Sequence, residues 1–105
     1  MDKFEGTPAP WFVSPKKNIE VTGDMNVIQT NGSNCLGYHI AYACGWTDDS
    51  STSIEATKNA QLIAAAPELL EELIETHAAL CFTPDYIGSL RYERNKAAIA
   101  KALGK

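Results

Sequence analysis

The stretch NAQLIAAAPELLEEL, from Asn59 to Leu73, decides how the second half of the chain folds. Its alanines, leucines and glutamates are strong helix formers, yet Pro67 lies in the middle. A proline inside a helix lacks a donor and clashes with the carbonyl four residues back, at a cost of about 3 kcal/mol, whereas the first helical position accepts it. We therefore predict a helical segment ending near Ala65 and a second one opened by Pro67, joined by a sharp kink or a tight corner.

The helical stretch is expected to cover a β-sheet with one face and to meet water with the other. Helical spacing groups the apolar residues as Leu62, Ile63, Ala66, Leu69, Leu70, Leu73 and Ile74. The residues expected to face water are Glu68, Glu71, Glu72 and Glu75. Upstream, Thr52 and Glu55 form a capping box, which predicts that the first helix begins near Ser53.

The part of the chain before this helix carries strand and turn signals. Extended segments are predicted at Ala9–Val13, Asn18–Val21, Met25–Gln29 and Leu36–Cys44. A turn at residues 22–24 and the Asn-Gly hairpin signal in TNGSN (30–34) separate the later ones. In the last segment, alternation predicts Tyr38, Ile40 and Tyr42 on one face and His39, Ala41 and Ala43 on the other.

A last helix is predicted over roughly Ser89–Leu103, after a stop at Thr83-Pro84. The charge is split, because residues 53–82 carry a net −4 and residues 83–105 a net +3. An acidic helix and a basic helix suit antiparallel packing, within one chain or between two. Together these signals predict an α+β fold: an N-terminal antiparallel β-meander of three to four strands packed against C-terminal helices. The 105 residues are expected to form a single domain, with the sheet in 1–49 and the helices in 50–105.

Composition argues against several classes of function. The net charge of −4 is unlike the basic footprint of a protein that binds nucleic-acid polymers. No apolar run approaches membrane-spanning length, and the N-terminus MDKFEGTPAP lacks a signal-peptide core, so a cytoplasmic protein is expected. Cys35, Cys44 and Cys81 show no C-x-x-C spacing and are expected to be free thiols. We therefore expect no metal and no cofactor.

Catalysis is not expected. The chain has two histidines, His39 and His77, and neither belongs to a motif with a known mechanism. His77 is most simply a boundary residue on the acidic helix. We accordingly predict a binding protein without catalytic residues.

The segment YIGSLRYERNK (86–96) is the main candidate binding site. Helical spacing allows Arg91, Arg94 and Asn95 to share one face, and two guanidinium groups there suit a phosphate. Tyr86 and Tyr92 lie nearby in sequence and are of the type that stacks on a base. The alternative is that both arginines pair with the acidic helix and both tyrosines fill the core.

Three further residues are ligand-binding candidates. Trp11 follows a stiff Pro-x-Pro and either stacks on a ligand or closes the core. Trp46 follows the last strand and is the aromatic residue more expected to be exposed. His39, in the middle of that strand, completes the set.

Three motifs carry a family resemblance: TPAPWFV (7–13), NAQLIAAAPELLEEL (59–73) and AAIAKALG (97–104). Together they resemble small phage and prophage proteins that open with TPGPW and carry NARLIAAAPELLEAL, with a variable β region between. The resemblance covers about half of the chain. The present sequence departs from the pattern at Ala9, where glycine is usual, and at Glu72, where alanine is common.

The expected architecture is also similar to that of phage anti-Thoeris and anti-CBASS sponge proteins, which have a sheet followed by long helices and assemble as oligomers. This resemblance implies a homo-oligomer that binds a small immune nucleotide, cyclic or ADP-ribose-derived, without cleaving it, inside an infected bacterium. The alternative is a protein–protein inhibitor or adaptor that acts on a host defence factor.

Overall fold

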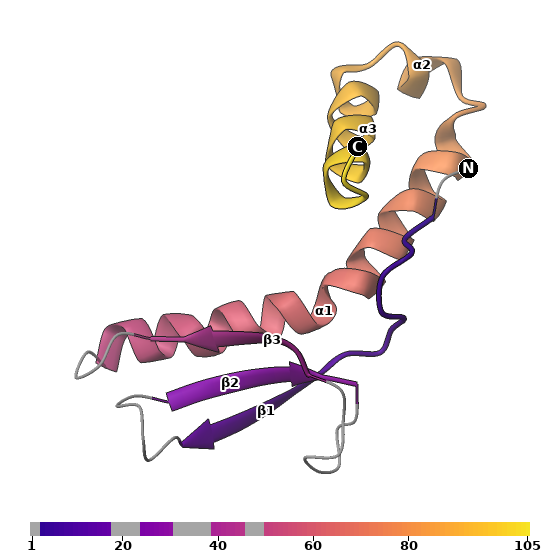
Figure 1. Cartoon of the computed structure of the whole chain (residues 1–105). Helices are drawn as coiled ribbons and strands as arrows, with labels where there is room; N and C mark the ends of the chain where they lie inside the picture. Colours follow the sequence, from indigo (N-terminus) through magenta and orange to yellow (C-terminus); the bar gives the residue numbers. More distant parts are fainter. Residues whose placement is uncertain (1–2, 18–23, 31–38, 46–49) are drawn as a thin grey trace. The chain divides into compact units, whose positions relative to one another are not determined.

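The computed structural model describes residues 3–17, 24–30, 39–45 and 50–105 (Figure 1). The elements in chain order are β1 (Phe12–Lys17), β2 (Asp24–Gln29), β3 (His39–Cys44), α1 (Ser50–Leu80), α2 (Pro84–Ile87) and α3 (Leu90–Ala102). The α+β fold is therefore confirmed. By their contacts the residues form two compact units: Thr7–Pro67, here the sheet unit, and Met1–Gly6 with Glu68–Lys105, here the helical unit.

The sheet has three antiparallel strands in the order β1-β2-β3. Pro15 lies within β1 and has no backbone N–H, which fits an outer strand better than a central one. The central strand β2 matches its prediction, while β1 begins inside the predicted segment Ala9–Val13 and continues to Lys17. The predicted strand Asn18–Val21 and the Asn-Gly turn lie outside the described residues.

A β-bulge near the start of β3 changes which residues share a face. Gln29 pairs with His39, but Ile28 pairs with Ala41, so one additional residue is inserted in β3. The insertion interrupts the alternation of faces along the strand. His39 consequently contacts Tyr42 through a 2.8 Å hydrogen bond between Nδ1 and the hydroxyl. The prediction that His39 shares a face with Ala41 and Ala43 was therefore wrong.

The first half of α1 lies along the sheet and closes its core (Figure 1). Ala60 is fully buried against Ile28 and Ala43, since small side chains allow a helix and a sheet to approach closely. Ile63 and Ala64 pack around this cluster. Leu62 and Leu69 were expected in the covering stripe but are 64% and 55% exposed, and Ala66 is exposed too, so that part of the prediction was wrong.

Among the described residues, β2 carries two buried polar side chains, Asn26 and Gln29. Asn26, on β2, is 2% exposed, and its Nδ2 donates a 3.2 Å hydrogen bond to the carbonyl oxygen of Ala43. This bond offsets the cost of removing an amide from water.

The chain stays helical through Pro67. Helix α1 runs without interruption from Ser50 to Leu80, so Pro67 does not open a separate helix, and that prediction was wrong. The helix also begins earlier than the expected Ser53. Pro67 is buried and lies at the boundary between the two compact units. Pro67 lies on the same buried face of α1 as Ala56 and Ala60. Packing of its ring there offsets part of the free energy that a proline costs inside a helix.

The ends of α2 and α3 are defined by local signals. Pro84 opens α2 directly after the N-cap Thr83. Ser89 caps α3, its hydroxyl oxygen accepting a 3.2 Å hydrogen bond from the backbone N–H of Tyr92. Gly104 follows the last turn with a φ of 78°, which glycine adopts without steric cost. The predicted helix Ser89–Leu103 is confirmed to within one residue at each end.

Candidate functional site

The hydroxyl group of Tyr86 joins three elements of the helical unit. Tyr86 comes from α2 and is 9% exposed. Its hydroxyl lies 2.6 Å from Nδ1 of His77, on α1, and accepts a 3.0 Å hydrogen bond from Nδ2 of Asn95, on α3. The Tyr86 hydroxyl oxygen therefore contacts side chains of α1 and α3 at the same time.

Aromatic rings pack around this hydroxyl. The ring of Tyr92 lies 5.1 Å from that of His77 in a tilted arrangement and 5.6 Å from that of Tyr86 edge to face. Nζ of Lys96 lies 5.9 Å from the centroid of the Tyr92 ring, at the range of a cation–π contact. We call His77, Tyr86, Tyr92 and Asn95 the tyrosine cluster. Within this cluster, Tyr92 is half-buried, and its ring is the one that has a cation, Lys96, next to it.

Arg91 and Arg94 lie on α3 and are exposed. Neither forms an ion pair with any residue in the described part of the chain. Asn95, which was expected to share a face with them, instead directs its amide to Tyr86. The two arginine side chains are therefore open to solvent on the same helix as Tyr92 and Asn95.

Sequence analysis left His77 as a boundary residue, and the structure places it inside the tyrosine cluster. Its contact with Tyr86 connects residues nine positions apart across the end of α1. The signal in the sequence was the segment from Thr83 to Gly88. This segment reverses the chain and brings its own Tyr86 back toward α1. Periodicity within one helix does not show such a contact.

The other candidates belong to the sheet unit. Trp11 is half-buried, packs against the Ile28 core, and donates a 3.0 Å hydrogen bond from Nε1 to the Thr7 carbonyl. His39 is exposed, and its ring contacts that of Tyr42 edge to face, with an angle of 88° between the ring planes. Trp46 lies outside the described residues. The structure therefore places Trp11 and His39 with the sheet, and the remaining candidates with the helices.

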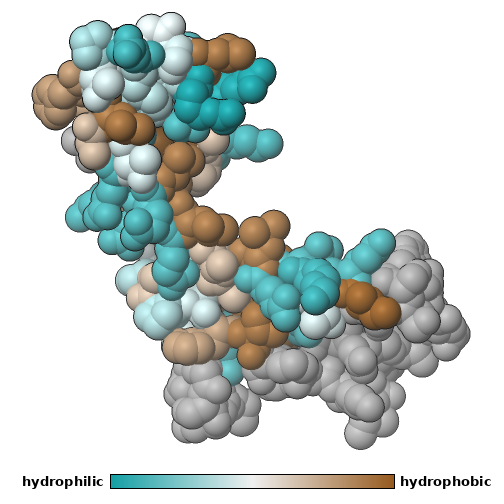
Figure 2. Space-filling model, turned by 180° about the vertical axis from the view of Figure 1, so that it is seen from behind, coloured by the Kyte–Doolittle hydropathy of each residue, from teal (hydrophilic) through white to brown (hydrophobic). Residues whose placement is uncertain are grey.

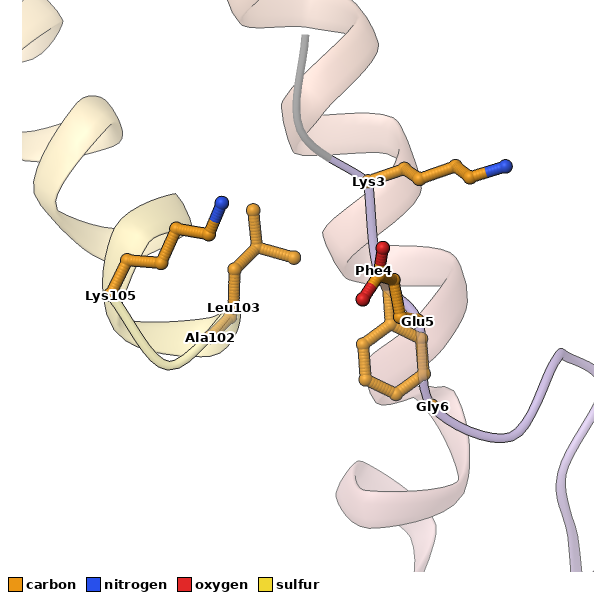
Figure 3. A pocket seen from close by; sticks show the side chains of 7 residues that line it. All are labelled: Lys3, Phe4, Glu5, Gly6, Ala102, Leu103 and Lys105. Carbon is orange, nitrogen blue, oxygen red and sulfur yellow. The ribbon is translucent and has the colours of Figure 1, made fainter.

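A pocket that sequence reasoning missed lies in the helical unit (Figure 3). It has a volume of about 420 Å³ and lies between the N-terminal segment and the end of α3. Phe4 and Leu103 supply apolar surface, and Lys3, Glu5 and Lys105 supply charge. Lys3 extends away from α3 in this view, so the side chains do not converge on one point.

The described residues include no group of three or more histidine, cysteine or carboxylate side chains arranged to hold a metal ion. Cys44 and Cys81 are free thiols, while Cys35 lies outside the described residues. No helix in the described chain combines the length and apolar character needed to cross a bilayer. The remaining candidate groups are the exposed Arg91 and Arg94 and the ring of Tyr92, all of which come from α3.

The chain was compared with known proteins. Neither the curated proteins nor the solved structures contained a match. A family model described as Salmonella phage P22 protein Y8K6 matches residues 1–105, and the chain therefore belongs to this family of phage proteins.

Proposed function

We propose that this phage protein binds a small nucleotide immune signal in the host cytoplasm and sequesters it without cleaving it, as a counter-defence protein. The observation that carries the proposal is that Arg91 and Arg94, on the helix that also carries Tyr92, are exposed and form no ion pair within the described chain. Membership of a phage family supports the counter-defence setting.

The arginines supply the phosphate recognition in this proposal. A guanidinium group offers paired N–H donors that match phosphate oxygens, and Arg91 and Arg94 are three positions apart on α3. Since neither forms an ion pair within the described chain, binding a phosphate breaks no such pair. Lys96, above the Tyr92 ring, adds a third positive charge. A ligand with two phosphates and an exposed base suits this arrangement.

The tyrosine cluster supplies the rigid support. The rings of His77 and Tyr86 pack against Tyr92 and limit its motion, so little side-chain entropy is lost when a base stacks there. Base–aromatic stacking contributes about 1–3 kcal/mol per base. The net charge of −4 over the whole chain favours a small ligand over a polymer.

A binding experiment tests the proposal. The purified protein is titrated by calorimetry with a panel of cyclic dinucleotides, cyclic trinucleotides and ADP-ribose derivatives. We expect one class to bind, and expect Arg91→Ala or Arg94→Ala to weaken binding at least tenfold, about 1.4 kcal/mol. The matched control is Lys58→Ala, which removes an exposed positive charge from the sheet unit. Absence of binding across the panel would contradict the proposal.

Sequestration is distinguished from catalysis by the fate of the ligand. The protein is incubated with lysate from bacteria whose nucleotide-signalling defences are active, washed and denatured, and the released compounds are weighed by mass spectrometry. An intact nucleotide supports sequestration. A ligand of altered mass, or depletion of the signal without capture, contradicts it and indicates an enzyme.

A second candidate function is inhibition of a host defence protein, which Phe82 favours. This side chain lies two residues after the end of α1 and is 88% exposed, and aromatic residues, phenylalanine included, are enriched at protein–protein interfaces. A host protein captured by the wild type but not by Phe82→Ala, with nucleotide binding absent, would favour this function over the first.

A further inference from the structure

The helical unit has almost no buried core. Among its described residues, 3–6 and 68–105, only Tyr86 is buried. Its large apolar side chains that remain exposed are Phe4, Leu69, Leu80, Phe82, Ile87 and Leu90. Figure 2 shows apolar surface, in brown, on the part of the molecule that contains these helices. Burial of apolar surface is the main favourable term in folding, so these helices lack part of the covering that stabilises a helical unit.

One uncovered surface is a stripe along the outer side of α3. Leu90, Arg94, Ala97 and Lys101 are spaced by four, three and four residues, which places them on one helix face, and all are exposed. Leu90 is 64% exposed. This basic stripe combines an apolar anchor with two positive charges.

A second uncovered surface follows the later half of α1. Leu69, Glu72, Thr76 and Leu80 are spaced by three, four and four residues and are all exposed. Residues 68–80 carry four glutamates and no lysine or arginine, whereas α3 carries four basic residues and one glutamate. This acidic stripe is therefore opposite in charge to the basic stripe.

The two stripes also match in length. In each stripe the last residue lies eleven residues after the first, which corresponds to roughly 16 Å along a helix. Each combines leucine with charge of a single sign. Two acidic stripes would repel one another, and so would two basic ones, so the complementary surface for each is the other stripe.

We propose that these stripes form the interface with a second copy of this chain. The acidic stripe of each copy packs against the basic stripe of the other, which gives two equivalent contacts and a closed two-fold dimer. Leu69, Leu80 and Leu90 lose water at the contact, and Lys101 of the basic stripe faces the acidic stripe. The proposal does not depend on nucleotide binding. It does place Arg94 at the border between two copies.

Sedimentation velocity without nucleotide tests the interface. The wild-type protein is expected at twice the 11.4 kDa of the chain, and Leu90→Glu is expected to raise the dimer dissociation constant at least tenfold. The matched control is Ile54→Glu, because Ile54 is 62% exposed on the half of α1 that belongs to the sheet unit. It is expected to remain a dimer. Circular dichroism confirms that both variants keep their helices.

Charge complementarity has its own pair of variants. Glu72→Lys adds a positive charge opposite the basic stripe and is expected to weaken the dimer at least tenfold. Glu55→Lys makes the same change on an exposed residue of the sheet unit and is expected to have no effect. Higher salt is expected to weaken the wild-type dimer, since it screens the opposing charges.

Three results would overturn the proposal. A wild-type protein that remains a monomer at every attainable concentration excludes the interface. An assembly larger than a dimer excludes the reciprocal two-fold arrangement. Equal effects of Leu90→Glu and Ile54→Glu show that the contact lies elsewhere. Since all three are measured without ligand, they leave the proposed nucleotide binding to its own test.

Discussion

At the scale of single residues, the Tyr86 hydroxyl is the group on which the helical unit depends most. It contacts His77 and Asn95 while Tyr86 itself is buried. The three residues come from three helices, so one oxygen atom links elements that also meet through the rings of His77, Tyr86 and Tyr92. A tyrosine that stacks on a ligand has to present its ring to solvent. Tyr92 is half-buried and Tyr86 is buried, so Tyr92 suits that role better.

Tyr86→Phe is expected to lower the free energy of unfolding by about 1–2 kcal/mol, because it leaves two partly buried polar groups without their partner. Urea denaturation followed by circular dichroism measures the change. Tyr92→Phe is the matched control, since no hydrogen bond of the Tyr92 hydroxyl is present among the described residues, and it is expected to change stability by less than about 0.5 kcal/mol. Equal effects would show that the hydroxyl of Tyr86 does not link the helices.

At the scale of elements, α1 contains both a fully buried alanine at its contact with the sheet and a proline, the residue least favourable inside a helix. Ala60 is fully buried where the helix meets the sheet, and Pro67 lies seven residues later on the same buried side. Since Pro67 has no N–H, the carbonyl of Ile63 loses its normal intrahelical partner. The helix nevertheless continues to Leu80.

Pro67→Ala is expected to increase the free energy of unfolding by about 1–2 kcal/mol, which is less than the full cost of a helical proline because a buried ring is lost. Gln61→Pro places a proline at an exposed interior position of the same helix and is expected to cost about 3 kcal/mol. Thermal denaturation compares both with the wild type. A loss of stability in Pro67→Ala would mean that the packing of the ring outweighs the missing hydrogen bond.

Ala60→Leu tests the close contact between α1 and the sheet. The larger side chain has no room against Ile28 and Ala43, and the expected cost is about 1–3 kcal/mol. Ala66→Leu makes the same change at an exposed position of α1 and is expected to be nearly neutral. Chemical denaturation of the two variants side by side measures the difference, and a neutral Ala60→Leu would argue against the packing described here.

At the scale of the whole molecule, stability and association are expected to be linked. If the acidic and basic stripes are covered by a second copy, the folded dimer gains stability by mass action, and the Tm rises with protein concentration. Calorimetry over a hundredfold concentration range measures this dependence. Leu90→Glu is expected to abolish it and Ile54→Glu to retain it. A wild-type Tm independent of concentration would contradict the proposed dimer.

The sequence by itself determined the α+β class, the position of β2, and α3 with its boundaries, because these depend on local signals: residue periodicity, the Ser89 cap and Gly104. It also placed Arg91 and Arg94 on α3. Only the tertiary structure decided that α1 continues through Pro67, that a bulge turns His39 toward Tyr42, and that Leu62 stays exposed while Ala60 is buried. The physical reason is common to all three. Each depends on which distant residues pack together, and local propensity does not specify that contact.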